Sequence, residues 1–516
     1  MKSSAFLSRR HFLALSLAGA AGAALRCPAA PDVAFDIESE PFTLGVASGD
    51  PLEDRVIIWT RLAPEPVNVG GGMPDGPATV VWEVASDPDF DQVVRSGLAV
   101  AHPSLAHSVH VDVPRLEPDS WYWYRFTAGL YQSPVGRTRT LPPRDSSPDE
   151  LRFAVASCQN YKDGYYTAHA GLAQEDLDLV LFVGDYIYES GADGNPPIPD
   201  RNHNGSRLRS LGSYRKRYGL YKSDPDLQAA HAAFPWIVTW DDHEVENNYA
   251  GFVQDVEKPP TDMATLRANA YLAYYEHMPI RVLPPKGPDL VIHRSFEYGD
   301  LAKFYVADTR QFRSDQRCND QIGPACPEVG DPGDTLLGDA QEAWLQQEML
   351  ASRGLWNVLT QQVVFTPTVF ADVFLNPDQW DGYPVARQRI NDFVTANDVR
   401  NFVVLSGDIH ASGAAYISET ASDPATPVIG AEFVAQGISS AFDPQLANIV
   451  EPLALQLPHV RAFDARKRGY LRCSVRRDQW VTDIRGVETA LEPVSTVSTI
   501  TTLAMEPGNL DPQVVS

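Results

Sequence analysis

Residues 234–249 read Phe234-Pro235-Trp236-Ile237-Val238-Thr239-Trp240-Asp241-Asp242-His243-Glu244-Val245-Glu246-Asn247-Asn248-Tyr249. The first six of these residues are almost wholly apolar and predict a buried strand. The ten that follow hold four acids, one histidine and two amides. So much charge at the end of a buried strand is costly unless a positive group balances it. A metal ion is the simplest such group, so the segment predicts a strand that ends at a metal site.

Three other polar clusters follow predicted buried strands in the same way. They are Ser157-Cys158-Gln159-Asn160, Gly184-Asp185-Tyr186-Ile187-Tyr188-Glu189 and Gly407-Asp408-Ile409-His410. In an open α/β sheet, ligands bind at the carboxyl ends of the strands, where several clusters can meet. Each cluster alone has an ordinary explanation, such as a turn or a packed cysteine. Four clusters with one placement instead predict a shared site, and their mixed oxygen, nitrogen and sulfur donors suit unlike metals.

Strand-like and helix-like segments alternate after residue 150. Residues 152–157, 179–183, 356–360 and 401–406 are short apolar runs that predict buried strands. Residues 227–234, 266–277 and 339–351 have the spacing of apolar side chains that is typical of helices. The alternation predicts a layered α/β domain over residues 150–485, with two packed sheets flanked by helices.

The regions on either side of this domain have different patterns. Residues 40–142 carry short alternating or aromatic runs between prolines, glycines and aspartates, which predict a fibronectin- or immunoglobulin-like β-sandwich. Residues 141–148 are rich in proline and predict a linker. Residues 486–516 are polar and predict a C-terminal tail, which either covers the site or is partly disordered.

The N-terminus predicts an export signal. Ser8-Arg9-Arg10-His11-Phe12-Leu13 is followed by a run of small and apolar residues, 14–25, which is too short to span a bilayer. Residues 1–30 therefore predict a twin-arginine signal peptide, with an ordinary secretory signal as the alternative. We expect an exported protein, periplasmic or extracellular, that engages the twin-arginine export machinery and has no transmembrane segment.

Charge and cysteines add two expectations. The net charge of −25, from 42 basic and 67 acidic residues, argues against a nucleic-acid partner because phosphate backbones require basic surfaces. It does not exclude small phosphate esters, because a buried metal reverses the local sign of charge. Cys318 and Cys326 lie eight residues apart in a loop and predict a local disulfide, whereas Cys473 lies in a predicted strand and is expected in the core.

The ordered set of motifs resembles that of the PhoD-type alkaline phosphatases. The motifs are Ser-Cys-Gln at 157–159, Gly-Asp-Tyr-Ile-Tyr-Glu at 184–189, Trp-Asp-Asp-His-Glu at 240–244, Asp-Thr-Arg at 308–310 and Gly-Asp-Ile-His at 407–410. The resemblance spans almost the whole chain and implies a small β-domain before a calcineurin-like metallophosphatase domain. The wider superfamily opens its site with Asp-x-His, where this chain has Ser157-Cys158-Gln159. That departure agrees with the PhoD-type pattern, in which the cysteine ligates iron.

The resemblance also implies a set of metal ligands. Four residues would hold a ferric ion: Cys158, Asp185, Tyr188 and His410. Anionic cysteine and tyrosine ligands favour Fe³⁺. Asp185 would bridge to a second site that is rich in oxygen and suited to Ca²⁺, with two calcium ions expected in all. Its other ligands would be Asp242 and Asp408, with Asn248 and Asp308 as further candidates.

These positions predict an exported, metal-dependent phosphoesterase that hydrolyses phosphate monoesters and also diesters by attack of a metal-activated water. His243 either protonates the leaving alkoxide or orients Asp242. Arg310 either contacts the phosphate or pairs with Asp308. Two other functions remain open: a dedicated phosphodiesterase, similar to phospholipase D, and a non-catalytic exported protein that binds metal or phosphate.

Overall fold

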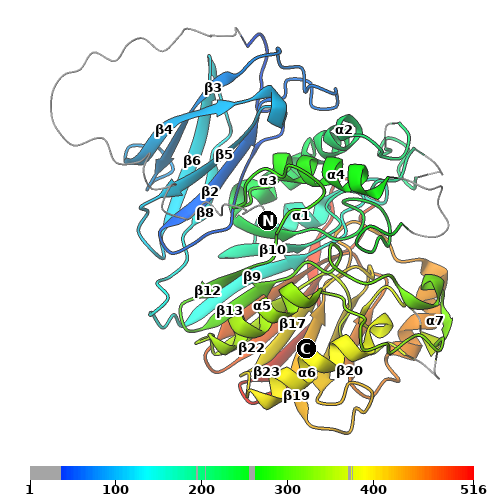
Figure 1. The fold of residues 1–516 in the computed structure, drawn as a ribbon. Helices are drawn as coiled ribbons and strands as arrows, with labels where there is room; N and C mark the ends of the chain where they lie inside the picture. The colour runs from blue at the N-terminus through cyan, green and yellow to red at the C-terminus, as the bar shows by residue number, and fades with distance from the viewer. Residues whose placement is uncertain (1–36, 193–195, 204, 255–261, 370–372, 375) are drawn as a thin grey trace, which may run out of the picture. The chain divides into compact units, whose positions relative to one another are not determined.

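A computed structural model of the 516-residue chain describes residues 37–192, 196–203, 205–254, 262–369, 373–374 and 376–516. The predicted signal segment, residues 1–30, lies outside these ranges. Most of the strands of the described chain belong to two large sheets (Figure 1).

The larger sheet has ten strands. In spatial order they are β24 (Asn509–Val514), β23 (Val497–Glu506), β22 (Trp480–Val487), β21 (Gly469–Arg476), β9 (Glu150–Ala156), β10 (Leu179–Val183), β11 (Pro235–Thr239), β1 (Val46–Gly49), β2 (Arg55–Arg61) and β5 (Ser108–Pro114). Strands β9, β10, β11 and β1 are parallel to one another, and the other pairs are antiparallel. The three parallel strands β9, β10 and β11 therefore bring their carboxyl ends to one edge of the sheet.

The second sheet has seven strands. In spatial order they are β12 (Arg294–Tyr298), β13 (Ala302–Val306), β15 (Trp356–Thr360), β17 (Phe402–Ser406), β19 (Val428–Val434), β18 (Ser412–Ser418) and β20 (Val460–Asp464). Strands β13, β15, β17 and β19 are parallel. A short separate pair joins β14 (Gly323–Pro324) to β16 (Val373–Phe374).

Alternation of side chains along the strands explains how the layers form. In β10, Leu181 contacts the core between the two sheets, whereas Phe182 contacts the core beneath the helices. In β17, Leu405 faces the same inter-sheet core and Val404 faces the opposite way. Because successive side chains of a strand point to opposite faces, strands that are apolar throughout are buried on both sides. The two sheets therefore pack face to face, with helices outside them, as the sequence predicts.

The helices divide between the two outer faces (Figure 1). On the ten-stranded sheet lie α1 (Thr167–Leu172), α2 (Leu211–Lys222), α3 (Pro225–Ala233) and α4 (Met263–His277). On the seven-stranded sheet lie α5 (Asp339–Leu350) and α6 (Pro384–Ala396). A further helix, α7 (Pro444–Ala454), lies near β20, and short 3₁₀ turns occur at Pro103–Leu105, Arg317–Asp320 and Trp380–Gly382.

The N-terminal region forms two packed β layers, but one of these layers is continuous with the ten-stranded sheet, and an immunoglobulin- or fibronectin-like topology stays a prediction. Its smaller sheet contains β4 (Val93–Ala101), β3 (Ala78–Ala85), β6 (Trp121–Ala128), β7 (Tyr131–Gln132) and β8 (Gly136–Arg139). This sheet packs across an apolar core on β1, β2 and β5. Those three strands belong to the ten-stranded sheet, because β1 pairs in parallel with β11 through Ser48 and Gly49. The pattern of apolar residues predicts strands but not the partner of an edge strand.

The C-terminal segment also differs from the prediction. Residue 486 lies inside β22, and the following residues add β23 and β24 to the ten-stranded sheet. Leu503 and Met505 of β23 are buried in the core between the sheets. The segment is therefore part of the sheet rather than a tail over the site. Its polar composition predicts a tail, but β-branched threonine suits a half-buried strand.

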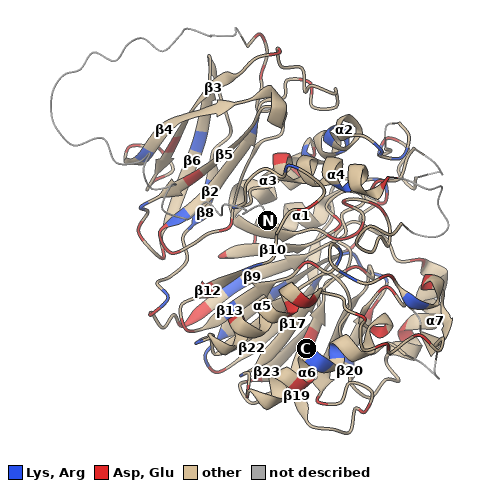
Figure 2. Ribbon diagram, viewed as in Figure 1, with Lys and Arg blue, Asp and Glu red and all other residues tan. Residues whose placement is uncertain are grey.

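Three smaller expectations concern the cysteines, the helices and the charge. The predicted disulfide between Cys318 and Cys326 is present, and Cys473 is buried in β21. Within the described ranges, no helix is both long enough and apolar enough to cross a membrane. Acidic and basic residues are interspersed along the described chain (Figure 2).

Candidate active site

The four predicted clusters all follow strands whose carboxyl ends lie together. Cys158 follows β9, Asp185 and Tyr188 follow β10, Asp242 and His243 follow β11, and Asp408 and His410 follow β17. The first three strands belong to one sheet and β17 to the other. The site is therefore built where the ends of both sheets meet, and the two-sheet core fixes its position.

Left-handed backbone conformations concentrate at these strand ends. The φ angles are 57° at Cys158, 58° at Asp185, 52° at Asn248, 69° at Asp408 and 56° at His410. Residues other than glycine rarely adopt this region, and each instance costs about 1–3 kcal/mol. Such strain persists only where the surrounding structure enforces it, and it is typical of functional sites.

Backbone contacts hold the first two strand ends together. The Cys158 N–H donates to the Gly184 carbonyl at 3.1 Å, and the Gln159 N–H donates to the Asp185 carbonyl at 3.0 Å. Gly184 has a φ of +108°, and a Cβ atom there would lie 2.4 Å from Asp241 Cβ. Glycine is therefore required at this position for the ends of β10 and β11 to approach each other.

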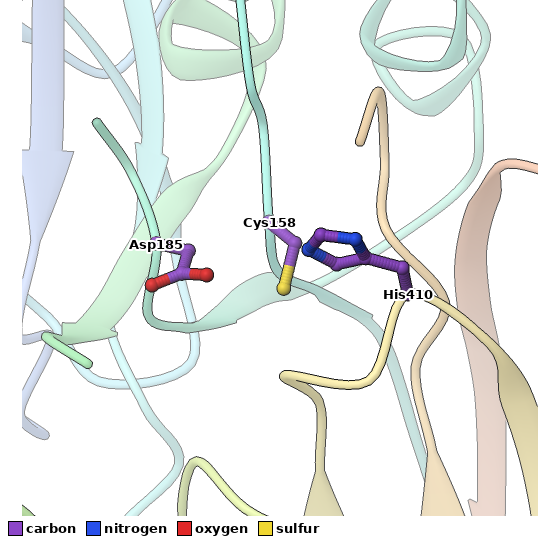
Figure 3. Close-up of side chains that lie close together, drawn as sticks. All are labelled: Cys158, Asp185 and His410. Atoms are coloured by element: carbon purple, nitrogen blue, oxygen red, sulfur yellow. The ribbon is translucent and has the colours of Figure 1, made fainter. Parts of the chain in front are cut away.

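Cys158, Asp185 and His410 form the first group of candidate metal ligands (Figure 3). Their ligand atoms all lie within 4.8 Å of one another. Tyr188 joins them, because its hydroxyl donates to Asp185 Oδ2 at 2.9 Å and lies 3.0 Å from His410 Nε2. The structure thus brings together the four residues expected to hold iron.

The orientation of His410 suits a metal ligand. Its Nδ1 lies 3.1 Å from the Ala441 carbonyl, which can only accept a hydrogen bond. Nδ1 therefore carries the proton, and the lone pair of Nε2 points toward Tyr188 and the group. In most metal-binding histidines, the ring nitrogen that does not bind the metal donates a hydrogen bond of this kind, which fixes the tautomer.

Asp241, Asp242 and Asp408 form a second group, and Asp185, Asp242 and His243 form a third. Asp242 Oδ2 accepts the Asn248 N–H at 2.7 Å, whereas Asp242 Oδ1 is buried with no hydrogen-bond partner among the described residues. Asp408 Oδ2 accepts from Gln379 Nε2 at 2.9 Å. An orphaned carboxylate oxygen beside other carboxylates fits a cation ligand.

The raised pKa values of Asp408 and Cys158 indicate too little positive charge around these two groups. Burial raises the pKa of Asp408 to about 7, and Asp242 adds to the shift. Burial also raises the pKa of Cys158 well above its usual range, and Asp185 and Asp408 raise it further. A multivalent cation would stabilise the ionised forms of all these groups. The donor chemistry and the charge therefore both fit metal binding.

His243 is oriented by a residue for which the sequence suggested no role. Its Nδ1 lies 2.7 Å from Glu189 Oε2, and its ring packs on Tyr188 at 4.2 Å between centroids. Glu189 is buried, and its other oxygen accepts from Arg207 and from the Asn247 N–H. Burial alone would lower the pKa of His243, but Asp242, Asp185 and Glu189 raise it well above its usual value.

Arg310 contacts acids other than the one that the sequence suggested. Its guanidinium is fully buried and donates to Asp241 at 2.5 Å and to Asp378 at 2.7 Å. Nη2 lies 3.6 Å from Asp242 Oδ1 and 3.9 Å from Asp408 Oδ1, and it has no hydrogen-bond partner among the described residues. Arg310 therefore supplies positive charge beside the second group, with one nitrogen still available.

Asn248 and Asp308, the two further candidate ligands, differ in their contacts. Asn248 lines the cavity of the site, and its Nδ2 donates to Asp320. Asp308 is in none of the three groups. Its Oδ1 accepts the N–H groups of Arg310 and Gln311, and its Oδ2 accepts from Gln311 Nε2. The contacts of Asp308 hold the loop after β13.

Glu244 is a further residue whose role the sequence did not indicate. Its buried carboxylate accepts the N–H groups of Asp185 at 3.0 Å, Tyr186 at 2.5 Å and Asp241 at 2.8 Å. It therefore joins the ends of β10 and β11. Its position one residue after His243 is the only signal of this role in the sequence.

A cavity of about 580 Å³ gives access to the site. Asp185, Asp242, His243, Asp408 and His410 all line it. Much of the remaining lining is apolar, and part of it comes from Leu446, Ile449, Val450 and Leu453 of α7.

Two face-to-face sheets between helices, with acids, histidines and a thiol at their strand ends around a cavity, define a layered α/β protein with a candidate metal site. The chain belongs to the PhoD-like phosphatase family: the family model matches residues 153–484, and the model of the family's N-terminal domain matches residues 27–142. It is accordingly a phosphatase, and the resemblance inferred from the motifs is confirmed.

Individual relatives agree with this assignment. Alkaline phosphatase D of Bacillus subtilis (strain 168) is 46% identical over 498 residues, which cover 94% of this chain and 84% of that protein. A solved structure of PhoD is 44% identical, with a TM-score of 0.89 and coverage of 94% of each chain.

Proposed function

We propose that this phosphatase is an exported, metal-dependent phosphoesterase that releases phosphate from monoesters and also accepts diesters. The observation that carries the proposal is the pair Asp242 Oδ1 and Arg310 Nη2. They are buried 3.6 Å apart without hydrogen-bond partners among the described residues, and Asp242 lines an open cavity. The free carboxylate oxygen of Asp242 suits a metal ion, and the free guanidinium nitrogen of Arg310 suits an oxygen of a phosphate bound to that metal. The name alkaline phosphatase D, borne by a relative 46% identical, supports phosphate esters as substrates.

In this proposal Cys158, Asp185, Tyr188 and His410 hold Fe³⁺. Asp185 also faces the second site, where Asp242, Asp408 and Asn248 hold Ca²⁺, with two calcium ions in all. When bound, the ions polarise the phosphoryl oxygens and lower the pKa of a water molecule. The mixed donor set supports unlike metals, because a thiol and a phenol favour iron whereas carboxylates and an amide favour calcium.

The chain's own residues supply orientation and a proton. Glu189 fixes Nδ1 of His243, so that the Nε2 proton of the imidazolium is free to reach the leaving alkoxide. Arg310, held by Asp241 and Asp378, keeps Nη2 turned toward the carboxylates, where a phosphoryl oxygen would gain a charge-assisted hydrogen bond.

Turnover and elemental analysis test the proposal together. We expect protein purified through its native export route to contain iron and calcium and to hydrolyse p-nitrophenyl phosphate and its bis-ester. Turnover of the bis-ester with little of the monoester would favour the dedicated phosphodiesterase. Metal-loaded protein that hydrolyses neither ester would favour the non-catalytic binding protein and overturn the proposed activity.

The export part of the proposal rests on Arg9 and Arg10, which precede an apolar run. Lysine at both positions should stop export while leaving the folded protein inside the cell. The matched control is Arg26→Lys, which lies beyond the apolar run. Undiminished export of the double-lysine variant would contradict the twin-arginine route.

A further inference from the structure

Helix α7 carries an apolar stripe that the core of the protein does not cover. Leu446, Ile449, Val450 and Leu453 recur at the spacing i, i+3, i+4 and i+7, which places them on one face. Leu446 is 52% exposed and Ile449 is 58% exposed, whereas Ala447 is the buried residue of the helix. A surface helix normally turns such a stripe toward the core. The exposed stripe of α7 therefore indicates a binding surface.

The helix is attached through a different face. Ala447 packs against Ala411 and Ala465. Glu451 Oε1 accepts the Ala465 N–H at 2.9 Å, and Glu451 Oε2 pairs with Arg466 Nε at 2.8 Å. Residues 447 and 451 are one turn apart and lie to the side of the stripe. These contacts fix α7 while leaving its leucines and isoleucine directed elsewhere.

The stripe faces the active site. Leu446, Ile449, Val450 and Leu453 line the same cavity of about 580 Å³ as the candidate ligands. Ile409 continues the apolar wall between Asp408 and His410. The loop before α7 is tied to the site, because the Ala441 carbonyl accepts from His410 Nδ1. The apolar wall therefore begins directly beside the ligand residues.

We propose that this wall binds the alkyl or aryl group of a phosphate ester whose phosphoryl group lies at the candidate metal ligands, so that the enzyme prefers amphipathic esters. The inference rests on the proposed function and adds a substrate class to it. The occupant follows from the continuity of the cavity: one end is charged and the other apolar, as in an ester with an extended apolar group. A small polar ester would leave the stripe without a contact.

A series of n-alkyl phosphates from ethyl to hexyl tests the inference, with phosphate release as the readout. Full burial of one methylene strengthens binding by about fourfold, and a wall open to solvent on one side should give about half of that effect, or about twofold. We therefore expect KM to fall by about sixteenfold across the four added methylenes. The kcat should stay nearly constant, because the leaving alcohols have similar acidity.

Substitutions in α7 test whether its apolar residues cause the dependence of KM on chain length. Ile449→Ser and Leu453→Ser should each flatten the dependence of KM on chain length. The matched control is Leu455→Ser. Leu455 is 55% exposed at the end of the same helix but does not line the cavity. This control should retain the full dependence.

Several outcomes would overturn the inference. A KM that is independent of chain length, or a dependence that Ile449→Ser does not change, would remove the role of the wall. A dimer in sedimentation that Ile449→Ser dissociates would assign the stripe to a second copy, and binding to phosphatidylcholine vesicles lost in the same variant would assign it to a membrane surface. If no ester is turned over, the proposed function fails separately, and calorimetric binding of hexyl against ethyl phosphate still decides whether the wall binds alkyl groups.

Discussion

Replacing Glu244 with glutamine removes the negative charge that joins the ends of β10 and β11. Oε2 of Glu244 accepts the N–H groups of Asp185 and Asp241, and Oε1 accepts that of Tyr186. A glutamine whose oxygen replaces Oε2 keeps two of these bonds as neutral ones. Its NH₂ group then faces the Tyr186 N–H, so that two donors meet.

The expected change in the free energy of unfolding follows from these three hydrogen bonds. Losing a hydrogen bond to a charged acceptor costs about 1.5–3 kcal/mol, and leaving a buried N–H unsatisfied costs about 1–3 kcal/mol. Part of this loss is offset, because burial raises the pKa of Glu244 to about 8 and the ionised form is itself held at a cost. The comparison therefore applies at about pH 9, where the carboxylate is ionised. We expect the free energy of unfolding to fall by about 3 kcal/mol. Asp185, released from its left-handed conformation, would be misplaced enough to lower kcat about 100-fold.

Urea unfolding and phosphatase activity should be measured on the same preparations, well below the unfolding temperature. Glu432→Gln is the matched control. Its buried carboxylate accepts the N–H groups of Phe365 and Thr366 and two hydroxyls, but it is not a candidate ligand or a contact of one. Both variants should lose stability, and only Glu244→Gln should lose activity and metal. Equal activity losses in the two folded variants, or an unchanged stability of Glu244→Gln, would refute the role assigned to Glu244.

Three further predictions concern charge and protonation. Arg310→Met leaves Asp241 buried without a counter-charge and removes one of the two arginines that pair with Asp378, the other being Arg313. It should lower the free energy of unfolding by about 3–5 kcal/mol in urea titration, and a loss below about 1 kcal/mol would contradict the ion pairs. Glu189→Gln should lower kcat by about 10–100-fold at unchanged metal content, because His243 loses its anionic partner, and an unchanged kcat would exclude that role. His110 is half-buried and stacks on Tyr275, with its Nε2 bonded to the Met278 carbonyl, and desolvation lowers its pKa to about 4. The unfolded chain therefore binds this proton first, so its contribution is complete above about pH 6.5 and is lost as the pH falls toward 4, by up to about 3 kcal/mol. His110→Asn should lose this part of the acid sensitivity in urea titrations, and parallel pH profiles for variant and wild type would count against it.

The apolar patterns predicted the elements that the two-sheet core contains. The segments at 179–183 and 401–406 are apolar throughout because β10 and β17 are buried on both faces. The same patterns do not show which edges pair. The parallel pairing of β1 with β11 joins residues that are far apart in the chain, and it makes one layer of the N-terminal region continuous with the main sheet.

The candidate site was predictable where side chains follow strands directly. Cys158, Asp185, Asp242, Asp408 and His410 are assembled as their positions suggested. The supporting contacts were not predictable, because they depend on side-chain direction. Asp308 turns back to its own loop, and Asp378 reaches Arg310 from a segment about 70 residues away, so neither contact leaves a pattern in the sequence.

The central assignment is that Cys158 and its neighbours hold iron. Elemental analysis of protein purified through the native export route, for the wild type and for Cys158→Ala, tests it most directly. Cys473→Ala is the matched control, since that thiol is also buried but lies in β21 away from the candidate ligands. We predict iron in the wild type and in Cys473→Ala, and loss of both iron and activity in Cys158→Ala. Iron retained in Cys158→Ala, or a fully active wild type without iron, would contradict the assignment.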